Sequence, residues 1–187
     1  MISGPRAFPR LLYRGVSLKL SFVAVAAALL LAACESAGGT SVTTALPTAI
    51  ASAARIQTVA LHGVPAQGVS EGFADTFQAG VQKELDKCAK GDTPLTLDVT
   101  LTMFDRANPA MTWLIADANR ISGTAHLIDA SGAVVGEYQI SRQFAASGLI
   151  GVAMMANAED QMSAAFGAEV CKQAFDYKPY ARENRRR

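Results

Sequence analysis

The sequence predicts an α+β domain in which two helices cover one face of a four-stranded sheet, in the order β-α-β-β-β-α. Three observations lead to this class: stretches in which apolar and polar residues alternate, stretches in which apolar residues recur every four positions, and turn residues between them. The 187 residues are 50% apolar and 18% charged, which suits a single folded domain. With 17 basic and 16 acidic residues, the chain lacks the positive charge of a nucleic-acid binder.

The first predicted strand spans residues 55–61, where β-branched and polar residues alternate. A helix follows, because large apolar residues recur every four positions in the manner of an amphipathic helix. We expect Ser70 to cap its start and Gly91 to end it. The apolar residues of this helix are Phe73, Phe77, Val81 and Leu85.

The remaining elements follow the same two patterns. Residues 95–103 alternate strictly between apolar and polar side chains and form the clearest strand. Residues 120–128 and 134–140 resume the alternation on either side of a turn at residues 129–132, which predicts a hairpin. Asn157 is expected to cap a last helix. The apolar face of this helix consists of Met162, Phe166, Val170 and Ala174.

The two ends of the chain differ in composition from the predicted domain, residues 55–178. Residues 1–33 combine four basic residues, no acidic residue and a short apolar run, which is typical of a secretory signal. Residues 34–54 are rich in Ser, Thr, Gly and Ala and are predicted to be a flexible tether. Residues 179–187 are expected to be a basic, disordered tail.

The apolar run of the signal ends in Leu31-Ala32-Ala33-Cys34, which resembles the lipobox of bacterial lipoproteins. The resemblance implies that the thiol of Cys34 accepts a diacylglyceryl group and that Cys34 becomes the acylated, palmitate-bearing N-terminus. Several acyl chains would then anchor the protein stably in a membrane. The alternative is an ordinary secretory signal followed by a chance cysteine.

Residue 35 bears on the membrane in which the protein is expected. It is Glu, whereas by resemblance to enteric lipoproteins an Asp at this position favours retention at the inner membrane. The expected location is therefore the bacterial cell envelope, lipid-anchored and facing the periplasm, with the outer membrane favoured over the inner membrane.

The predicted topology also bears on the other two cysteines. If each element reverses the direction of the preceding one, both helices end at the same end of the sheet. Cys88 lies near the end of the first helix and Cys171 near the end of the last. In an oxidising periplasm this placement predicts a disulfide between them, the alternative being two separately buried thiols.

Candidate catalytic residues are few. His62 and His126 have no metal-ligand spacing to a Cys, Asp or Glu. The chain contains no HExxH or CxxC motif, no nucleophile elbow and no phosphate-binding glycine loop. Asp105 and Asp117 flank one loop, but turn chemistry explains them. The sequence therefore predicts a protein that is not an enzyme and that has no metal site and no cofactor.

Two connections, residues 107–118 and 145–156, carry a surplus of apolar side chains and are predicted to lie together, opposite the paired cysteines. Clustered apolar residues that include Met and Trp predict a contact surface for an envelope protein or an acyl chain. Alternatively, these loops fold back over the core, or residues 149–156 extend the last helix. The candidate binding residues are Met111, Trp113, Leu114, Ile115, Leu149, Ile150 and Met154.

The lipobox, the tether, the element order, the run AHLIDASGAVVG and the glycine-rich run at 148–151 together resemble uncharacterised small bacterial envelope lipoproteins. The arrangement is also similar to that of the lipopolysaccharide-assembly lipoprotein and the transport auxiliary lipoproteins. These resemblances imply a non-enzymatic accessory role in the envelope, and no ligand residue can be carried over from them. No nucleic-acid partner is expected, because the secretory signal predicts export. The rival classes are a purely structural envelope lipoprotein and a small hydrolase.

Overall fold

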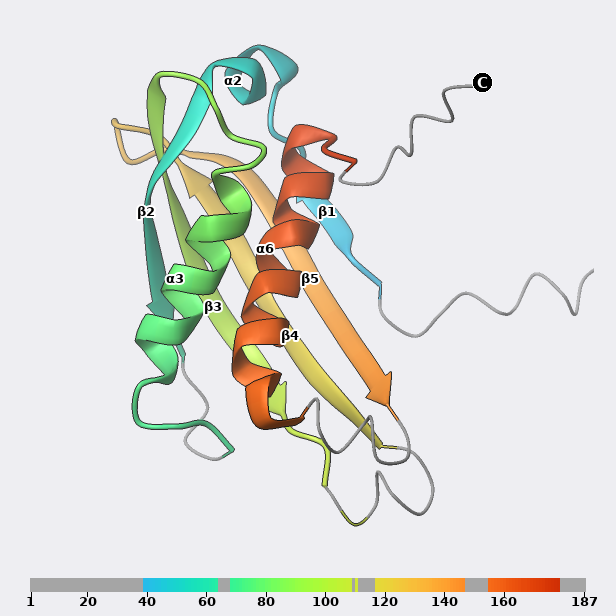
Figure 1. Cartoon of the computed structure of the whole chain (residues 1–187). Coiled ribbons are helices and arrows are strands. Elements are labelled where there is room, and N and C mark those ends of the chain that lie inside the picture. Colours follow the sequence, from blue (N-terminus) through green and yellow to red (C-terminus); the bar gives the residue numbers. More distant parts are fainter. Residues whose placement is uncertain (1–38, 64–67, 109, 111–116, 147–154, 179–187) are drawn as a thin grey trace, which may run out of the picture. The chain divides into compact units, whose positions relative to one another are not determined.

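A computed structural model describes residues 39–63, 68–108, 110, 117–146 and 155–178. The chain divides into two compact units, Met1–Ala37 and Gly38–Arg187, and every described residue belongs to the second. In this unit the strands form one sheet in the order β1-β5-β4-β3-β2, and α3 and α6 pack side by side on one of its faces (Figure 1).

The elements have the following bounds. The strands are β1 (Ser41–Thr44), β2 (Ala54–His62), β3 (Thr93–Asp105), β4 (Asp117–Ile128) and β5 (Val134–Ala146). The helices are α2 (Thr48–Ala53), α3 (Phe73–Leu85) and α6 (Ala158–Phe175), with a 3₁₀ turn η1 at Met155–Asn157. β2 and β3 pair in parallel through the α3 crossover, and the other neighbouring strands pair antiparallel.

The predicted α+β class and the two helices on one face of the sheet are confirmed, but the predicted four strands are wrong because the sheet has five. The additional strand β1 and the short helix α2 lie within residues 34–54, which the sequence suggested to be a tether. Leu46, between β1 and α2, is buried, and its backbone N–H donates a 2.7 Å hydrogen bond to the hydroxyl of Tyr138. The folded domain therefore begins well before residue 55.

The two residues that were expected to bound the helix α3, Ser70 and Gly91, have other roles. Ser70 does not cap α3, which begins after Gly72; instead its backbone N–H and its hydroxyl both donate to the carboxylate of Glu159, at 2.8 and 2.6 Å. Gly91 lies six residues beyond the end of α3, at Leu85, and packs against the start of β2. A Cβ at Gly91 would lie 2.0 Å from the carbonyl oxygen of Ala53, so the close approach of these two backbone segments requires glycine there.

The core lies between the sheet and the two helices. The apolar phase of β3 and β4 meets the predicted apolar faces of α3 and α6, where Phe77 and Phe166 are fully buried with ring centroids 5.5 Å apart. The opposite face of the sheet carries mainly polar side chains, with Thr100, Thr124 and Gln139 in register across three strands. The alternation seen in the sequence thus reflects one packed face and one polar face.

Candidate functional site

The domain has two ends, and each carries residues that the sequence marked as candidates. At the first, which we call the loop end, β3 and β5 end and β4 and α6 begin. At the second, the disulfide end, α3 and α6 end and β2 and β3 begin. The sequence placed the apolar connections at the first and the cysteine pair at the second.

The two apolar connections leave the sheet from neighbouring strands at the loop end. Asp117 at the start of β4 pairs with Ala146 at the end of β5, so the stems of both connections adjoin. This agrees with the expectation that the two connections share one end. The candidate binding residues themselves lie outside the described residues: Met111, Trp113, Leu114, Ile115, Leu149, Ile150 and Met154.

The stem of the first connection is held by side chains of β4. The amide oxygen of the buried Asn119 accepts a 2.9 Å hydrogen bond from the backbone N–H of Ala107, and the carboxylate of Asp117 accepts one of 2.9 Å from Asn108. The backbone N–H groups of Asn108 and Ala118 lower the pKa of Asp117. The chain therefore leaves and re-enters the sheet at fixed positions.

At the disulfide end, the predicted bond between Cys88 and Cys171 is confirmed, with their Cα atoms 5.7 Å apart. Cys88 follows α3 in a turn, and Cys171 lies in the penultimate turn of α6 with 1% of its surface exposed. The bond joins the two helices near their ends, as the antiparallel alternation of elements predicted.

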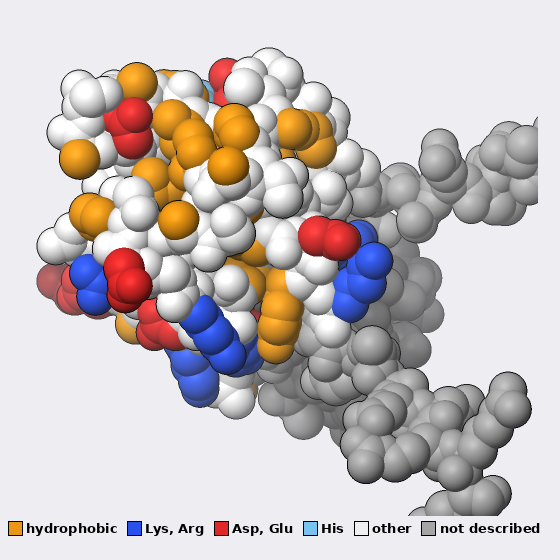
Figure 2. Space-filling model, turned by 90° about the horizontal axis from the view of Figure 1, so that it is seen from above, with side chains coloured by type: hydrophobic (Ala, Val, Ile, Leu, Met, Phe, Trp, Pro, Cys, Tyr) orange, Lys and Arg blue, Asp and Glu red, His pale blue; other side chains and the backbone are white. Residues whose placement is uncertain are grey.

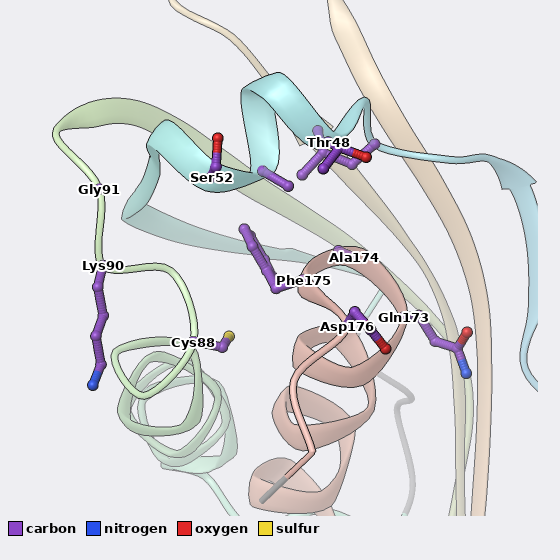
Figure 3. A pocket seen from close by; sticks show the side chains of 11 residues that line it. Thr48, Ser52, Cys88, Lys90, Gly91, Gln173, Ala174, Phe175 and Asp176 are labelled. Carbon is purple, nitrogen blue, oxygen red and sulfur yellow. The ribbon is translucent and has the colours of Figure 1, made fainter.

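A pocket of about 470 Å³ lies beside the disulfide, between α2 and the ends of α3 and α6. Phe175 extends from α6 toward α2, whereas the side chains of Lys90 and Gln173 run outward (Figure 3). In most small-molecule sites a few polar groups converge on the ligand. The polar side chains around this pocket do not converge on a common point. The sequence did not predict this pocket, because one of its walls is α2.

A buried carboxylate, Glu169, lies on the side of α6 that faces β5. One carboxylate oxygen accepts a hydrogen bond from Gln173 at 2.7 Å and lies 3.5 Å from the ammonium of Lys172, and the other accepts one from Arg142 at 3.2 Å. Burial alone would raise the pKa of Glu169, but Gln173, the two cations and the hydroxyl of Thr40 together hold it below its ordinary value.

Sequence reasoning missed Glu169, although a signal was present. Arg142 lies on the same phase of β5 as the buried Tyr138 and Ile140, and an arginine directed toward a core needs a carboxylate partner. Glu169 in turn sits next to the apolar stripe of α6. The network ties α6, β5 and the residue before β1 together.

The two histidines lie on the polar face of the sheet. His62 is 3.2 Å from Asp98, and His126 is 3.8 Å from Glu137. Among the described residues, no group of three or more His, Cys, Asp or Glu is arranged to hold a metal ion. Within the same part of the chain, no helix has both the length and the apolar character that crossing a bilayer requires.

Comparison with known proteins identifies the fold. No protein-family model and no curated protein matches the sequence. Among solved structures, a subunit of the PelC dodecamer from Paraburkholderia phytofirmans superposes with a TM-score of 0.52 at 15% identity, covering 73% of this chain and 98% of that one. The chain has the fold of this PelC subunit. At this identity the likeness concerns the fold alone.

Two more distant structures also match. One is a presumed lipoprotein from Caulobacter crescentus CB15, with a TM-score of 0.39 at 13% identity over 60% of this chain and 84% of that one. The other is a DUF330 protein from Xanthomonas campestris, with a TM-score of 0.41 at 13% identity over 71% and 93%.

Proposed function

We propose that this chain is a lipid-anchored accessory protein of the bacterial envelope, without catalytic activity of its own, that faces the periplasm and engages a partner through its loop end. The disulfide between Cys88 and Cys171 carries the proposal, because such bonds persist in oxidising compartments such as the periplasm. The secretory signal and the lipobox at Cys34 support the same location.

Substitution of the lipobox cysteine tests the anchor. We expect the mature wild-type protein to carry the mass of a diacylglyceryl group and an acyl chain on Cys34 and to fractionate with membranes. Cys34→Ala should lose this mass and the membrane association, because no thiol remains to be acylated. Intact-mass spectrometry and membrane fractionation measure both. A wild-type protein cleaved elsewhere and recovered unmodified from the periplasm would contradict the proposal.

Outer-membrane sorting is the finer part of the proposal and is supported by Glu35. Separation of inner and outer membranes on a density gradient should place the wild-type protein in the outer membrane. Glu35→Asp should shift it to the inner membrane if the sorting rule of enteric lipoproteins operates in the source organism, and Glu35→Gln is the matched control. A wild-type protein in the inner membrane would overturn the outer-membrane assignment alone.

Photo-crosslinking tests the partner. A photoreactive amino acid at Trp113 should give one dominant crosslinked product in cells, either a protein or a phospholipid, because the two apolar connections leave the sheet together. The control position is Gln139, an exposed residue on the polar face of the sheet. A purely structural lipoprotein would give no dominant product at Trp113, or the same products at both positions.

Further copies of the chain are a second candidate partner, because the PelC subunit that shares its fold was solved as a dodecamer. The sheet ends in β1 on one side and β2 on the other, and edge strands can pair between copies. Part of β2 is already engaged, since the side chain of Gln82 donates to the carbonyl oxygen of Ile56 at 3.1 Å. Light scattering on the mature protein would separate a monomer from a larger assembly.

A further inference from the structure

The folded domain begins close to the proposed anchor. Six residues separate Cys34 from Ser41, the first residue of β1. A fully extended chain covers at most about 3.5 Å a residue, so the covalent reach from Cys34 to Ser41 is at most about 25 Å. If Cys34 is acylated, the part of the domain around Ser41 is held beside the bilayer.

Ser41 lies nearer the disulfide end than the loop end. It pairs with Gln139, which is five residues from the start of β5 at Val134 and seven residues from its end at Ala146. From Ser41 the chain runs through β1 toward the disulfide end, where α2 lies (Figure 1). The residues that follow the anchor therefore lead to α2 and away from the loop end.

Apart from Glu35, the segment that follows the anchor is uncharged. Residues 36–54 contain no Asp, Glu, Lys, Arg or His, and their described part, residues 39–53, forms what we call the β1–α2 surface. All four residues of β1 are exposed, with Val42 at 46%, and α2 has no buried residue. Figure 2 looks down on this end and shows apolar and uncharged atoms over much of its centre, with charged side chains around its edges.

The charges of the domain also differ between its two ends. All five lysines of the described chain, at 83, 87, 90, 172 and 178, lie in or beyond the last turns of α3 and α6, at the disulfide end. Five carboxylates lie at the same end, so it is close to neutral: Glu84, Asp86, Asp92, Asp129 and Asp176. The loop end has six carboxylates and two arginines, Arg106 and Arg120. An anionic lipid surface attracts lysines and repels carboxylates. The six carboxylates are Glu71, Asp75, Asp105, Asp117, Glu159 and Asp160.

From these observations we propose that the β1–α2 surface lies against the lipid headgroups and that the loop end points away from the membrane into the periplasm. The acyl chains on Cys34 supply the affinity, as lipid anchors do. The uncharged surface sets the orientation, because small uncharged side chains lose little hydration at the headgroups. The inference rests on the proposed acylation of Cys34 and adds an orientation to it.

Quenching of a single tryptophan by brominated lipid tests the orientation. The lipidated protein, with acylation confirmed by intact mass, is placed in vesicles of phosphatidylethanolamine and phosphatidylglycerol that contain a brominated phospholipid. Trp113→Phe removes the one native tryptophan. A new one is then introduced by Ala49→Trp on α2 or by Ala74→Trp on α3 at the loop end, both exposed alanines in helices.

We expect brominated lipid to lower the fluorescence of the Ala49→Trp protein at least about twofold, because interfacial contacts lie within about 10 Å of the acyl boundary. The fluorescence of the Ala74→Trp protein should not change. Equal quenching at both positions, or stronger quenching at position 74, would overturn the orientation.

Hydrogen exchange on the unsubstituted protein gives a second measurement that needs no new side chain. The amides of residues 41–53 should exchange more slowly in vesicles than in soluble Cys34→Ala protein, while those of the first turn of α3 should not change. Uniform slowing, or slowing confined to the loop end, would contradict the orientation. A protein that carries no acyl group on Cys34 would refute the proposed anchor itself, so the two failures are distinguishable.

Discussion

At the scale of single residues, Glu169 is the one charged residue among the buried residues of the described domain. Its side chain is 6% exposed and is contacted by Arg142, Lys172 and Gln173. A buried carboxylate is tolerated only when such partners replace the lost water. Because those partners lower its pKa, folding stabilises the ionised form.

Glu169→Gln tests this electrostatic contribution. We expect the free energy of unfolding to fall by about 1–2 kcal/mol near pH 7, because the hydrogen bonds to charged donors weaken. The folded-state pKa of Glu169 lies below the unfolded-state value, so its contribution is present above the unfolded-state pKa and fades as the pH falls through the folded-state pKa.

Urea unfolding of the wild-type and Glu169→Gln proteins, from pH 7 down to a pH below the folded-state pKa of Glu169, measures this contribution. The difference between wild type and Glu169→Gln should shrink at acid pH, and a constant difference would contradict the electrostatic explanation. Glu71→Gln serves as the control, because Glu71 is exposed and its replacement should change the stability little at any pH.

At the scale of secondary-structure elements, β1 and α2 are the elements that sequence reasoning missed. They form a short edge strand and a six-residue helix, too short to be stable alone. Their position depends on Leu46, which packs into the core and bonds to Tyr138 across 92 residues of sequence. Such a segment is expected to open more readily than the core.

Tyr138→Phe should loosen β1 and α2 selectively. The substitution keeps the buried ring but leaves the backbone N–H of Leu46 unpaired, at a cost of about 1–3 kcal/mol. Hydrogen-exchange mass spectrometry should show faster exchange over residues 41–53 and unchanged exchange in β3 and β4. Tyr177→Phe, at a half-buried tyrosine, is the matched control. Equal acceleration throughout the sheet would instead indicate a general loss of stability.

At the scale of the whole domain, the disulfide connects the two helices that cover the sheet. Cys88 and Cys171 are separated by 83 residues, so the bond closes a loop that contains β3, β4 and β5. In the chain-entropy model, a closed loop restricts the unfolded chain and stabilises the folded state relative to it.

The double substitution Cys88→Ala and Cys171→Ala should lower the free energy of unfolding by about 2–4 kcal/mol. Thermal unfolding of the mature domain with and without reductant measures the same contribution in the wild-type protein. Reductant should lower the melting temperature of the wild-type protein and leave that of the double variant unchanged. A reductant effect of equal size in both proteins would contradict an assignment to this bond.

Sequence patterns identified the elements that bury a regular face. The period of two in β3 to β5 and the period near four in α3 and α6 arise because one side of each element packs against the core. With the order of the elements known, alternation of their directions placed Cys88 and Cys171 at one end. The secretory signal is likewise readable locally, because it depends on charge and apolar length alone.

Only the tertiary structure decided the roles of residues 39–53 and of Glu169. Residues 39–53 bury one large side chain, that of Leu46, and otherwise consist mainly of small, uncharged residues. Their composition is therefore that of a linker, even though they fold against β5 and α6. Glu169 becomes buried because the packing of α6 against β5 brings Arg142 beside it. In both cases the stabilising partners are remote in sequence or lie in another element, and no local periodicity records a contact of that kind.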